Sequence, residues 1–370
     1  MDYSYSVISS SDGGYVLAGY SYSYGAGESD LWLVKTNAHG QEEWNQAFGG
    51  SGREFGSSVI ETSLTGYIVL GGTESYGAGD YDLWLLKINT AGQVEWNRTI
   101  GGLGAEYAFS VIGSSDGGFV LAGRTESYGA GGTDMWLVKT DTFGRVEWNR
   151  TFGGLTDDDA SYVLATTDGG YVLVGGTDSY GAGDMDVWLV RTNTNGDIEW
   201  NQTIGGLRED RANAIISTFD GGFVLAGLTQ SYGVGGRDVW LIKTNGTGYP
   251  EWNQTFGGNG HDTADSILRT PEGGYLLVGR TESFGAGKTD MWLIETTPTG
   301  QLERNQTFGG AEEEAAYSII ATVDGGYVVV GRTASYSVGL SDTWLIKIIP
   351  QTQSPSKWHA CIMKLEISKK

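Results

Sequence analysis

The chain has 370 residues, with 61 glycines, one cysteine and a formal net charge of −22 at pH 7. This charge repels phosphate backbones and anionic lipid head groups, and no apolar run is long enough to cross a bilayer. Nucleic acid and membrane insertion are therefore excluded as modes of action, and the single cysteine excludes an internal disulfide framework.

A 52-residue unit, the spacing from Trp32 to Trp84, fills nearly the whole chain. A repeat of this length is typical of a β-propeller blade. We predict an all-β, seven-bladed β-propeller with four antiparallel strands per blade, as a single domain over residues 1–370. The expected blades are 1–50, 51–102, 103–154, 155–206, 207–258, 259–310 and 311–370.

Four strand-like segments follow one another in each unit. In the first unit, residues 6–8 are short and mixed and fit the crowded centre of the ring. Residues 15–19 are continuously apolar, which predicts a strand buried on both faces and closed by a glycine that allows close sheet packing. Residues 30–35 hold Trp32, expected between neighbouring blades. Residues 43–45 are polar and suit the outer edge, where charge prevents aggregation.

The last part of the chain, 350–370, departs from the repeat. Arg304 already replaces the tryptophan of the fourth strand, and Glu295 replaces the basic residue that ends the third strand. Alternation over 361–367 still allows an outer strand for blade seven, although the tail could pair elsewhere. Because the chain begins at an inner strand, we expect the ring to close by face packing of blade one on blade seven.

The order of motifs also carries a resemblance. An acidic residue, Asp-Gly-Gly-Tyr, Ser-Tyr-Gly-Ala-Gly, Asp-x-Trp-Leu, Glu-Trp-Asn and Thr-Phe-Gly-Gly follow one another, as at residues 12–15 and 23–27. This order resembles the seven-bladed propeller repeats of bacterial and archaeal exported and surface proteins, and it differs from WD40 and kelch repeats. The resemblance implies an extracellular or cell-surface location and transfers no catalytic motif. The chain itself begins without a signal-peptide pattern.

An acidic residue precedes each inner strand and would line the channel mouth. Converging carboxylates could hold a cation or a basic ligand, and Ca²⁺ is the cofactor they would take, although none is required. Alternatively, each carboxylate organises its own turn. The ring consists of Asp2, Glu54, Glu106, Asp158, Asp210, Asp262 and Glu314.

A second acidic ring precedes the third strand on the same face. Its carboxylates are more simply explained as turn organisers than as a site. Its members are Asp30, Asp82, Asp134, Asp186, Asp238, Asp290 and Asp342. The loops before the inner strands differ most between copies, for example at 155–157 and 311–313, which suggests an asymmetric recognition surface.

The Ser-Tyr-Gly loops place an aromatic residue on that face in every blade. Such rings could stack on sugars as in a lectin, or could simply cover the blade ends. The residues are Tyr24, Tyr76, Tyr128, Tyr180, Tyr232, Phe284 and Tyr336.

Catalytic motifs are not found, since the three histidines are scattered and no zinc spacing, nucleophile elbow or phosphate-binding loop is present. The favoured function is a monomeric, non-enzymatic binding or scaffold module that recognises a protein or carbohydrate ligand through its acidic loop rim. The alternatives are lectin-like binding through the Ser-Tyr-Gly loops and a hydrolase with its site at the channel mouth.

Overall fold

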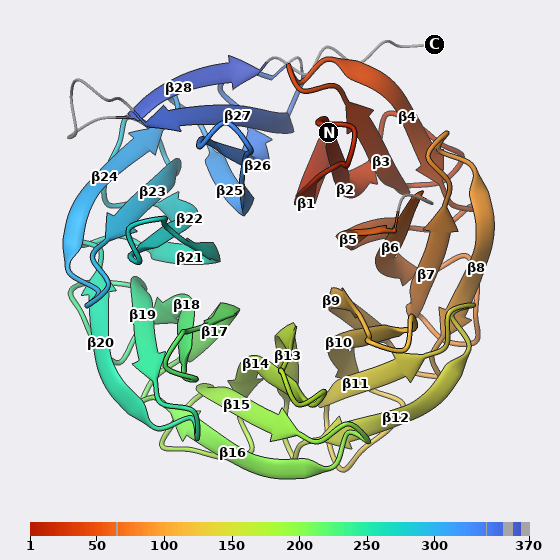
Figure 1. Ribbon diagram of the computed structural model, residues 1–370, viewed down its shortest axis with the longest axis horizontal. Helices are drawn as coiled ribbons and strands as arrows, with labels where there is room; N and C mark the ends of the chain where they lie inside the picture. Colours follow the sequence, from red (N-terminus) through yellow and green to blue (C-terminus); the bar gives the residue numbers. More distant parts are fainter. Residues whose placement is uncertain (64–65, 338, 351–357, 364–370) are drawn as a thin grey trace.

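The computed structural model describes residues 1–63, 66–337, 339–350 and 358–363. Within these ranges the chain forms seven four-stranded antiparallel sheets, arranged around a common axis (Figure 1). In each sheet the strands follow chain order from the axis outward. The prediction of an all-β, seven-bladed propeller with four antiparallel strands per blade is confirmed.

The strands have closely similar bounds in every blade. The first four blades contain β1 (Asp2–Ser9), β2 (Tyr15–Ser21), β3 (Asp30–Thr36), β4 (Glu42–Phe48), β5 (Glu54–Thr62), β6 (Gly66–Thr73), β7 (Asp82–Ile88), β8 (Val94–Ile100), β9 (Glu106–Gly113), β10 (Phe119–Thr125), β11 (Asp134–Thr140), β12 (Val146–Phe152), β13 (Asp158–Ala165), β14 (Tyr171–Thr177), β15 (Asp186–Thr192) and β16 (Ile198–Ile204). The last three contain β17 (Asp210–Ser217), β18 (Phe223–Thr229), β19 (Asp238–Thr244), β20 (Pro250–Phe256), β21 (Asp262–Arg269), β22 (Tyr275–Thr281), β23 (Asp290–Thr296), β24 (Leu302–Phe308), β25 (Glu314–Ala321), β26 (Tyr327–Thr333), β27 (Asp342–Pro350) and β28 (Trp358–Met363).

The core lies between blades and is built from the second and third strands, which are buried on both faces. Leu31 and Leu33 of blade 1 pack with Val69 and Trp84 of blade 2 in one buried cluster. Equivalent clusters join the other neighbouring blades, so the recurring tryptophan packs between blades, as expected from the sequence. The fourth strands form the polar outer edge.

Blade 7 closes the ring against blade 1 by face packing, as expected. The amide of Asp2 donates to the carbonyl of Ser341 (3.2 Å), and the hydroxyls of Ser4 and Thr343 are 3.1 Å apart. Trp32 packs with Leu345 in the buried cluster of this seam. The outer strand of blade 7 is β28, which pairs with β27, whereas residues 364–367 of the expected strand lie outside the described residues.

Every inner strand contains a β-bulge at the same place. In blade 1 the pairing of β1 with β2 shifts between Ser4 and Ser6, which leaves Tyr5 as the extra residue. A Cβ on Gly19, opposite the bulge, would lie 1.8 Å from the carbonyl oxygen of Tyr3. The glycine that closes the second strand is therefore required by close backbone approach within one blade, and not by sheet-on-sheet packing as the sequence suggested.

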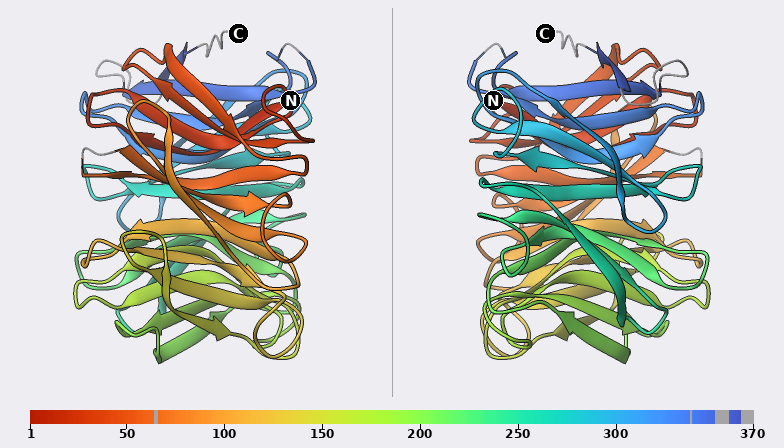
Figure 2. Two further views of the ribbon diagram at one scale, coloured as in Figure 1. Left: turned by 90° about the vertical axis from the view of Figure 1, so that its right-hand side faces the viewer. Right: turned by 90° about the vertical axis from the view of Figure 1, so that its left-hand side faces the viewer.

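The loops lie on two opposite faces of the ring (Figure 2). We call one face the linker rim. It carries the connections between blades, such as residues 49–53, and the loops between second and third strands. The other face, the hairpin rim, carries the turns between first and second and between third and fourth strands. The inner strands begin at the linker rim, so this rim surrounds one opening of the central channel.

Candidate functional site

Both acidic rings lie on the linker rim, as the strand order predicts. The amide of Glu54 donates to the carbonyl of Ser29 (2.8 Å), and the amide of Glu28 donates to the carbonyl of Gly52 (3.1 Å). These bonds hold each linker beside a loop of the preceding blade.

The carboxylates of the first ring are enclosed by their own turns. The side chain of Glu54 accepts hydrogen bonds from the hydroxyl of Thr73 (2.9 Å) and the amides of Ser75 (3.0 Å) and Gly50 (2.8 Å). Six members are fully buried: Glu54, Glu106, Asp158, Asp210, Asp262 and Glu314. Asp2 is partly buried and accepts hydrogen bonds from the hydroxyls of Ser21 and Ser23. This geometry supports the turn-organising interpretation, and a binding role for the ring stays a prediction.

The second ring lies close to the first at six blade junctions. The carboxylate of Asp82 accepts bonds from the amides of Ala78 (3.0 Å) and Gly79 (3.2 Å). A Cβ on Gly49 would lie 2.2 Å from Asp30 Oδ1 and 2.3 Å from Glu54 Oε2, so only glycine fits between the two acids. Burial, together with the neighbouring carboxylate, raises the pKa values of Asp134, Asp186 and Asp238.

The tyrosines of the Ser-Tyr-Gly loops fasten neighbouring blades. The hydroxyl of Tyr76 donates to the carbonyl of Gly49 (3.0 Å), and its ring packs on Trp84 at 5.5 Å. The same bond is made by Tyr128, Tyr180, Tyr232 and Tyr336. Tyr24 stacks on Trp32, and Phe284 packs on Trp292 with its ring tilted by 45°, both without this bond. Six of the seven side chains are exposed, and Tyr24 is partly buried. Sugar stacking on these loops stays a prediction, whereas their blade-covering role is supported by direct contacts.

The linkers that vary between copies expose apolar side chains on three consecutive blade junctions. Leu103, Leu155 and Leu207 are 86%, 85% and 80% exposed. Other linkers carry surface ion pairs, such as Arg53 with Glu28 (2.7 Å) and Lys288 with Glu312 (2.7 Å). The linker rim is thus uneven around the ring, in agreement with the expected asymmetry of its loops.

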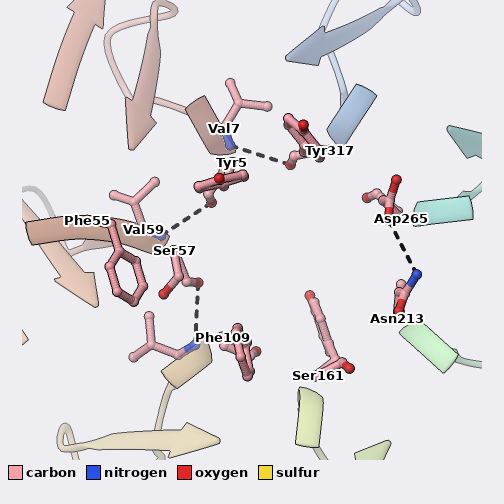
Figure 3. A pocket seen from close by; sticks show the side chains of 18 of the residues that line it. Tyr5, Val7, Phe55, Ser57, Val59, Phe109, Ser161, Asn213, Asp265 and Tyr317 are labelled. Carbon is pink, nitrogen blue, oxygen red and sulfur yellow. Dashed lines mark hydrogen bonds between the residues drawn. The ribbon is translucent and has the colours of Figure 1, made fainter. Parts of the chain in front are cut away.

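A pocket of about 730 Å³ lies on the axis of the ring and is lined by the inner strands. Side chains at the seven bulges project into it (Figure 3). We call these residues the bulge ring: Tyr5, Ser57, Phe109, Ser161, Asn213, Asp265 and Tyr317. β-bulges commonly direct side chains into active or binding sites. In a chain that repeats so strictly elsewhere, this position holds five different residue types.

The bulge ring has an aromatic arc and a polar arc. Tyr317 and Tyr5 lie on adjacent blades, with ring centroids 5.0 Å apart and planes at 62°. Asp265, Asn213 and Ser161 follow one another on blades 6, 5 and 4, with Asp265 on the blade next to that of Tyr317 (Figure 3). The aromatic lining continues to the mouth on the linker rim through Tyr20, Tyr22, Phe55 and Tyr81.

Asp265 is the charged member of the bulge ring. Its Oδ1 accepts a hydrogen bond from Asn213 Nδ2 (3.3 Å), whereas Oδ2 is buried and has no hydrogen-bond partner among the described residues. Burial raises the pKa of Asp265 to about 6, and Arg280 partly offsets this effect. Burial also raises the pKa of Tyr317 to about 12.

A hydrogen bond that links neighbouring inner strands at most blade junctions is missing beside the polar arc. At five junctions a serine hydroxyl accepts a hydrogen bond from an amide of the next blade, as when Ser6 accepts from Val59 (3.3 Å). Tyr162 and Ala214 replace this serine in blades 4 and 5. Asn213 instead donates to the carbonyl of Ala264 (2.9 Å) across the junction. Departures from an otherwise consistent local rule are expected at functional sites.

The bulge ring was missed in the sequence because it lies inside the inner strand and not in a loop. The signal that could have found it is the column of residues two positions before Val7 and its equivalents. There the copies read Tyr, Ser, Phe, Ser, Asn, Asp and Tyr, between one column that is alanine in five copies and another that is serine in five.

The described residues contain no group of three or more histidines, cysteines and carboxylates placed to hold a metal ion. They also contain no helix of the length and apolarity needed to span a bilayer.

The fold is that of a seven-bladed β-propeller, with a pocket on its axis that different side chains line on each blade. No protein-family model matches the chain. The chain is 27% identical over 313 residues to the Regulatory protein FlaEY of Caulobacter vibrioides. The match covers 74% of this chain and only 31% of that protein.

Solved structures show the same fold at low identity. Puromycin hydrolase has a TM-score of 0.58 and 13% identity, over 98% of this chain and 53% of that one. Sqt1 from Chaetomium thermophilum has a TM-score of 0.53 and 10% identity, over 94% of this chain and 81% of that one. The Pan2 WD40 domain from Neurospora crassa has a TM-score of 0.52 and 11% identity, over 96% of this chain and 98% of that one. These likenesses support the fold and leave the function open.

Proposed function

We propose that this protein is a non-enzymatic binding module that takes a small ligand, or a narrow part of a larger one, in its axial pocket. The observation that carries the proposal is the bulge ring: one backbone device, repeated seven times, delivers chemically different side chains to a single cavity. A pocket of about 730 Å³ is in the usual range for small-molecule sites.

The pocket composition favours binding over hydrolysis. Its described lining contains one carboxylate, Asp265, and neither histidine nor cysteine. A glycosidase needs two carboxylates, and acyl transfer needs an activated nucleophile. The resemblance to puromycin hydrolase is one of fold, so a hydrolase with its site at the channel mouth is the less supported alternative.

The test is a thermal-shift and calorimetric screen of the wild type, Tyr317→Ala and the linker-rim variant Tyr128→Ala. The screen covers sugars, organic amines, short peptides and divalent cations including Ca²⁺. A ligand at about 100 times its Kd should add about 2.7 kcal/mol to the free energy of unfolding. We expect this gain in the wild type and in Tyr128→Ala, and its loss in Tyr317→Ala. A gain that survives Tyr317→Ala and disappears in Tyr128→Ala would move the site to the rim.

Docking of a protein partner on the linker rim is a second candidate. It is favoured by the three consecutive exposed leucines at positions 103, 155 and 207, because clustered exposed apolar side chains mark interaction sites. The name of the relative, a regulatory protein, is compatible with such a role. The acidic rim of the sequence-based hypothesis would then supply the surrounding polar contacts.

This candidate is tested by replacing the three leucines with serine and comparing stable complexes formed by the variant and the wild type in the source cells. Loss of one defined complex, with unchanged ligand binding in the axial pocket, would support it. An extracellular or surface location also remains a proposal, and cell fractionation with an antibody to the protein tests it.

A further inference from the structure

The bulge ring carries enough chemistry to indicate a class of ligand, and this inference rests on the axial pocket being the binding site. The ligand must be complementary to three properties of the described pocket residues: an aromatic wall, a buried acceptor without a partner, and a balanced local charge.

The aromatic wall is continuous from the bulge ring to the linker rim. The ring centroid of Tyr5 lies 5.0 Å from that of Tyr317 and 5.8 Å from that of Tyr20. The centroids of Tyr20 and Tyr22 are 5.6 Å apart. All four rings line the pocket. Aromatic faces of this kind bind flat ligands that present polarised C–H groups or other rings. The wall therefore favours a ligand with an apolar face.

The polar arc offers donors and acceptors side by side. Asp265 Oδ2 is buried without a partner, although such an oxygen normally has one. The neighbouring Asn213 amide already donates to Asp265 and to Ala264, which fixes its orientation. A ligand that donates a hydrogen bond to Oδ2 would satisfy the one buried acceptor of the described pocket lining that has no partner. Hydroxyl and ammonium groups can both do this.

The local charge distinguishes these two donors. Arg280 is half-buried and acts electrostatically on both Asp265 and Tyr317, and Arg332 acts on Tyr317. Arg332 is itself paired with Glu313 (3.1 Å). The described lining of the pocket contains one carboxylate, Asp265, and one cation, Arg53, so it has no excess negative charge that would favour an ammonium ion over a neutral polyol. An anionic ligand would instead be repelled by Asp265 itself.

We propose that the axial pocket binds a neutral saccharide, with the sugar face on the Tyr5–Tyr317 wall and hydroxyl groups held by Asp265 and Asn213. This site differs from lectin-like binding through the Ser-Tyr-Gly loops, where five tyrosine hydroxyls are already bonded to the linkers.

The experiment is a glycan array followed by calorimetry with the soluble saccharides that score, using the full chain. Asp265→Ala and Tyr317→Ala are each expected to weaken binding roughly tenfold or more, because each removes a buried contact of the ligand. Tyr317→Phe keeps the stacking face and should bind nearly as well as the wild type. Tyr128→Ala is the matched control on the rim and should leave the affinity unchanged. Thermal melting confirms that each variant is folded.

Three outcomes would overturn the inference, and they separate it from the proposed function. If no saccharide binds but an organic amine does, and Tyr317→Ala abolishes this, the pocket remains the site and the saccharide class is wrong. If saccharides bind and only Tyr128→Ala weakens them, the lectin-like loops are the site. If no ligand of any class depends on Asp265 or Tyr317, the axial binding function itself fails.

Discussion

At the scale of single residues, the carboxyl group of Asp265 is held where burial opposes its charge. Its pKa in the folded protein is about 6, against 3.8 for an unperturbed aspartate. An acid with a raised folded-state pKa destabilises the fold only where it is ionised. The cost is absent below pH about 4 and complete above pH about 6.

Asp265→Asn should therefore raise the free energy of unfolding at pH 8 by up to about 3 kcal/mol and change it little at pH 4. Urea denaturation of both proteins at the two pH values measures this, with the exposed Asp184→Asn as control. An equal gain at both pH values would show that the effect does not come from the buried charge.

The buried acids of the first ring should behave in the opposite way. Asp262 accepts hydrogen bonds from the amide of Gly258 (3.0 Å) and from the hydroxyls of Thr281 and Ser283. Asp262→Asn turns an acceptor into a donor against these groups and should lower the free energy of unfolding by about 2 to 4 kcal/mol. Thermal melting of the Asp262→Asn variant measures this loss, with Asp80→Asn at an exposed position as the control. Unchanged melting together with lost cation binding would restore the binding interpretation of this ring.

Blade 6 contains a matched charge reversal. Elsewhere a basic residue at the end of the third strand pairs with acids, as Lys243 does with Asp220 (2.9 Å) and Glu251 (2.8 Å). In blade 6, Glu295 pairs with Arg304, whose guanidinium also lies 4.3 Å above the Trp358 ring. Two separate departures from the repeat thus compensate each other.

Glu295→Lys alone should cost about 3 kcal/mol, because it leaves two cations together in a largely buried site. Adding Arg304→Trp restores the residues of the other blades and should recover part of this loss. Denaturant unfolding of both single variants and the double variant measures the coupling. Additive effects would mean that the two residues act independently.

At the scale of the elements, the glycine that closes each second strand is set by the bulge of the inner strand. A Cβ on Gly279 would lie 2.0 Å from the carbonyl of Thr263, whereas a Cβ on Gly113 would meet no atom within 4 Å. Gly279→Ala should therefore destabilise the protein by about 3 kcal/mol or more, while Gly113→Ala should be nearly neutral. Thermal unfolding of the pair decides this. Similar melting of both variants would show that the bulge relaxes freely.

Strands and blade order were predictable because they depend on periodic patterns that each unit contains in full. Apolar runs such as 15–19 mark the buried second strand, and the tryptophan at position 32 marks the interface. The bulge at Tyr5 was not predictable, because it depends on how β1 pairs with β2, and one extra residue leaves no compositional trace in a single copy. The burial of Glu54 was missed for a similar reason, since its partner Ser75 lies 21 positions away.

At the scale of the whole molecule, the ring has one seam between blades that are distant in sequence. The buried cluster of this seam holds eight residues among those described, against ten to twelve at the other junctions. We expect the amides of β1, β2, β26 and β27 to exchange faster than those of β14, β15, β18 and β19, because local opening begins where burial is least. Hydrogen exchange with mass spectrometry measures this, and uniform protection around the ring would contradict it.

The bulge ring also has a consequence for how binding preferences could change. Each blade brings its pocket residue on the same backbone scaffold, so exchanging whole repeats would permute the chemistry of the cavity while leaving its framework intact. A tandem array of this kind behaves as a combinatorial receptor. New specificities would arise from shuffling of existing units, with few compensating changes required elsewhere.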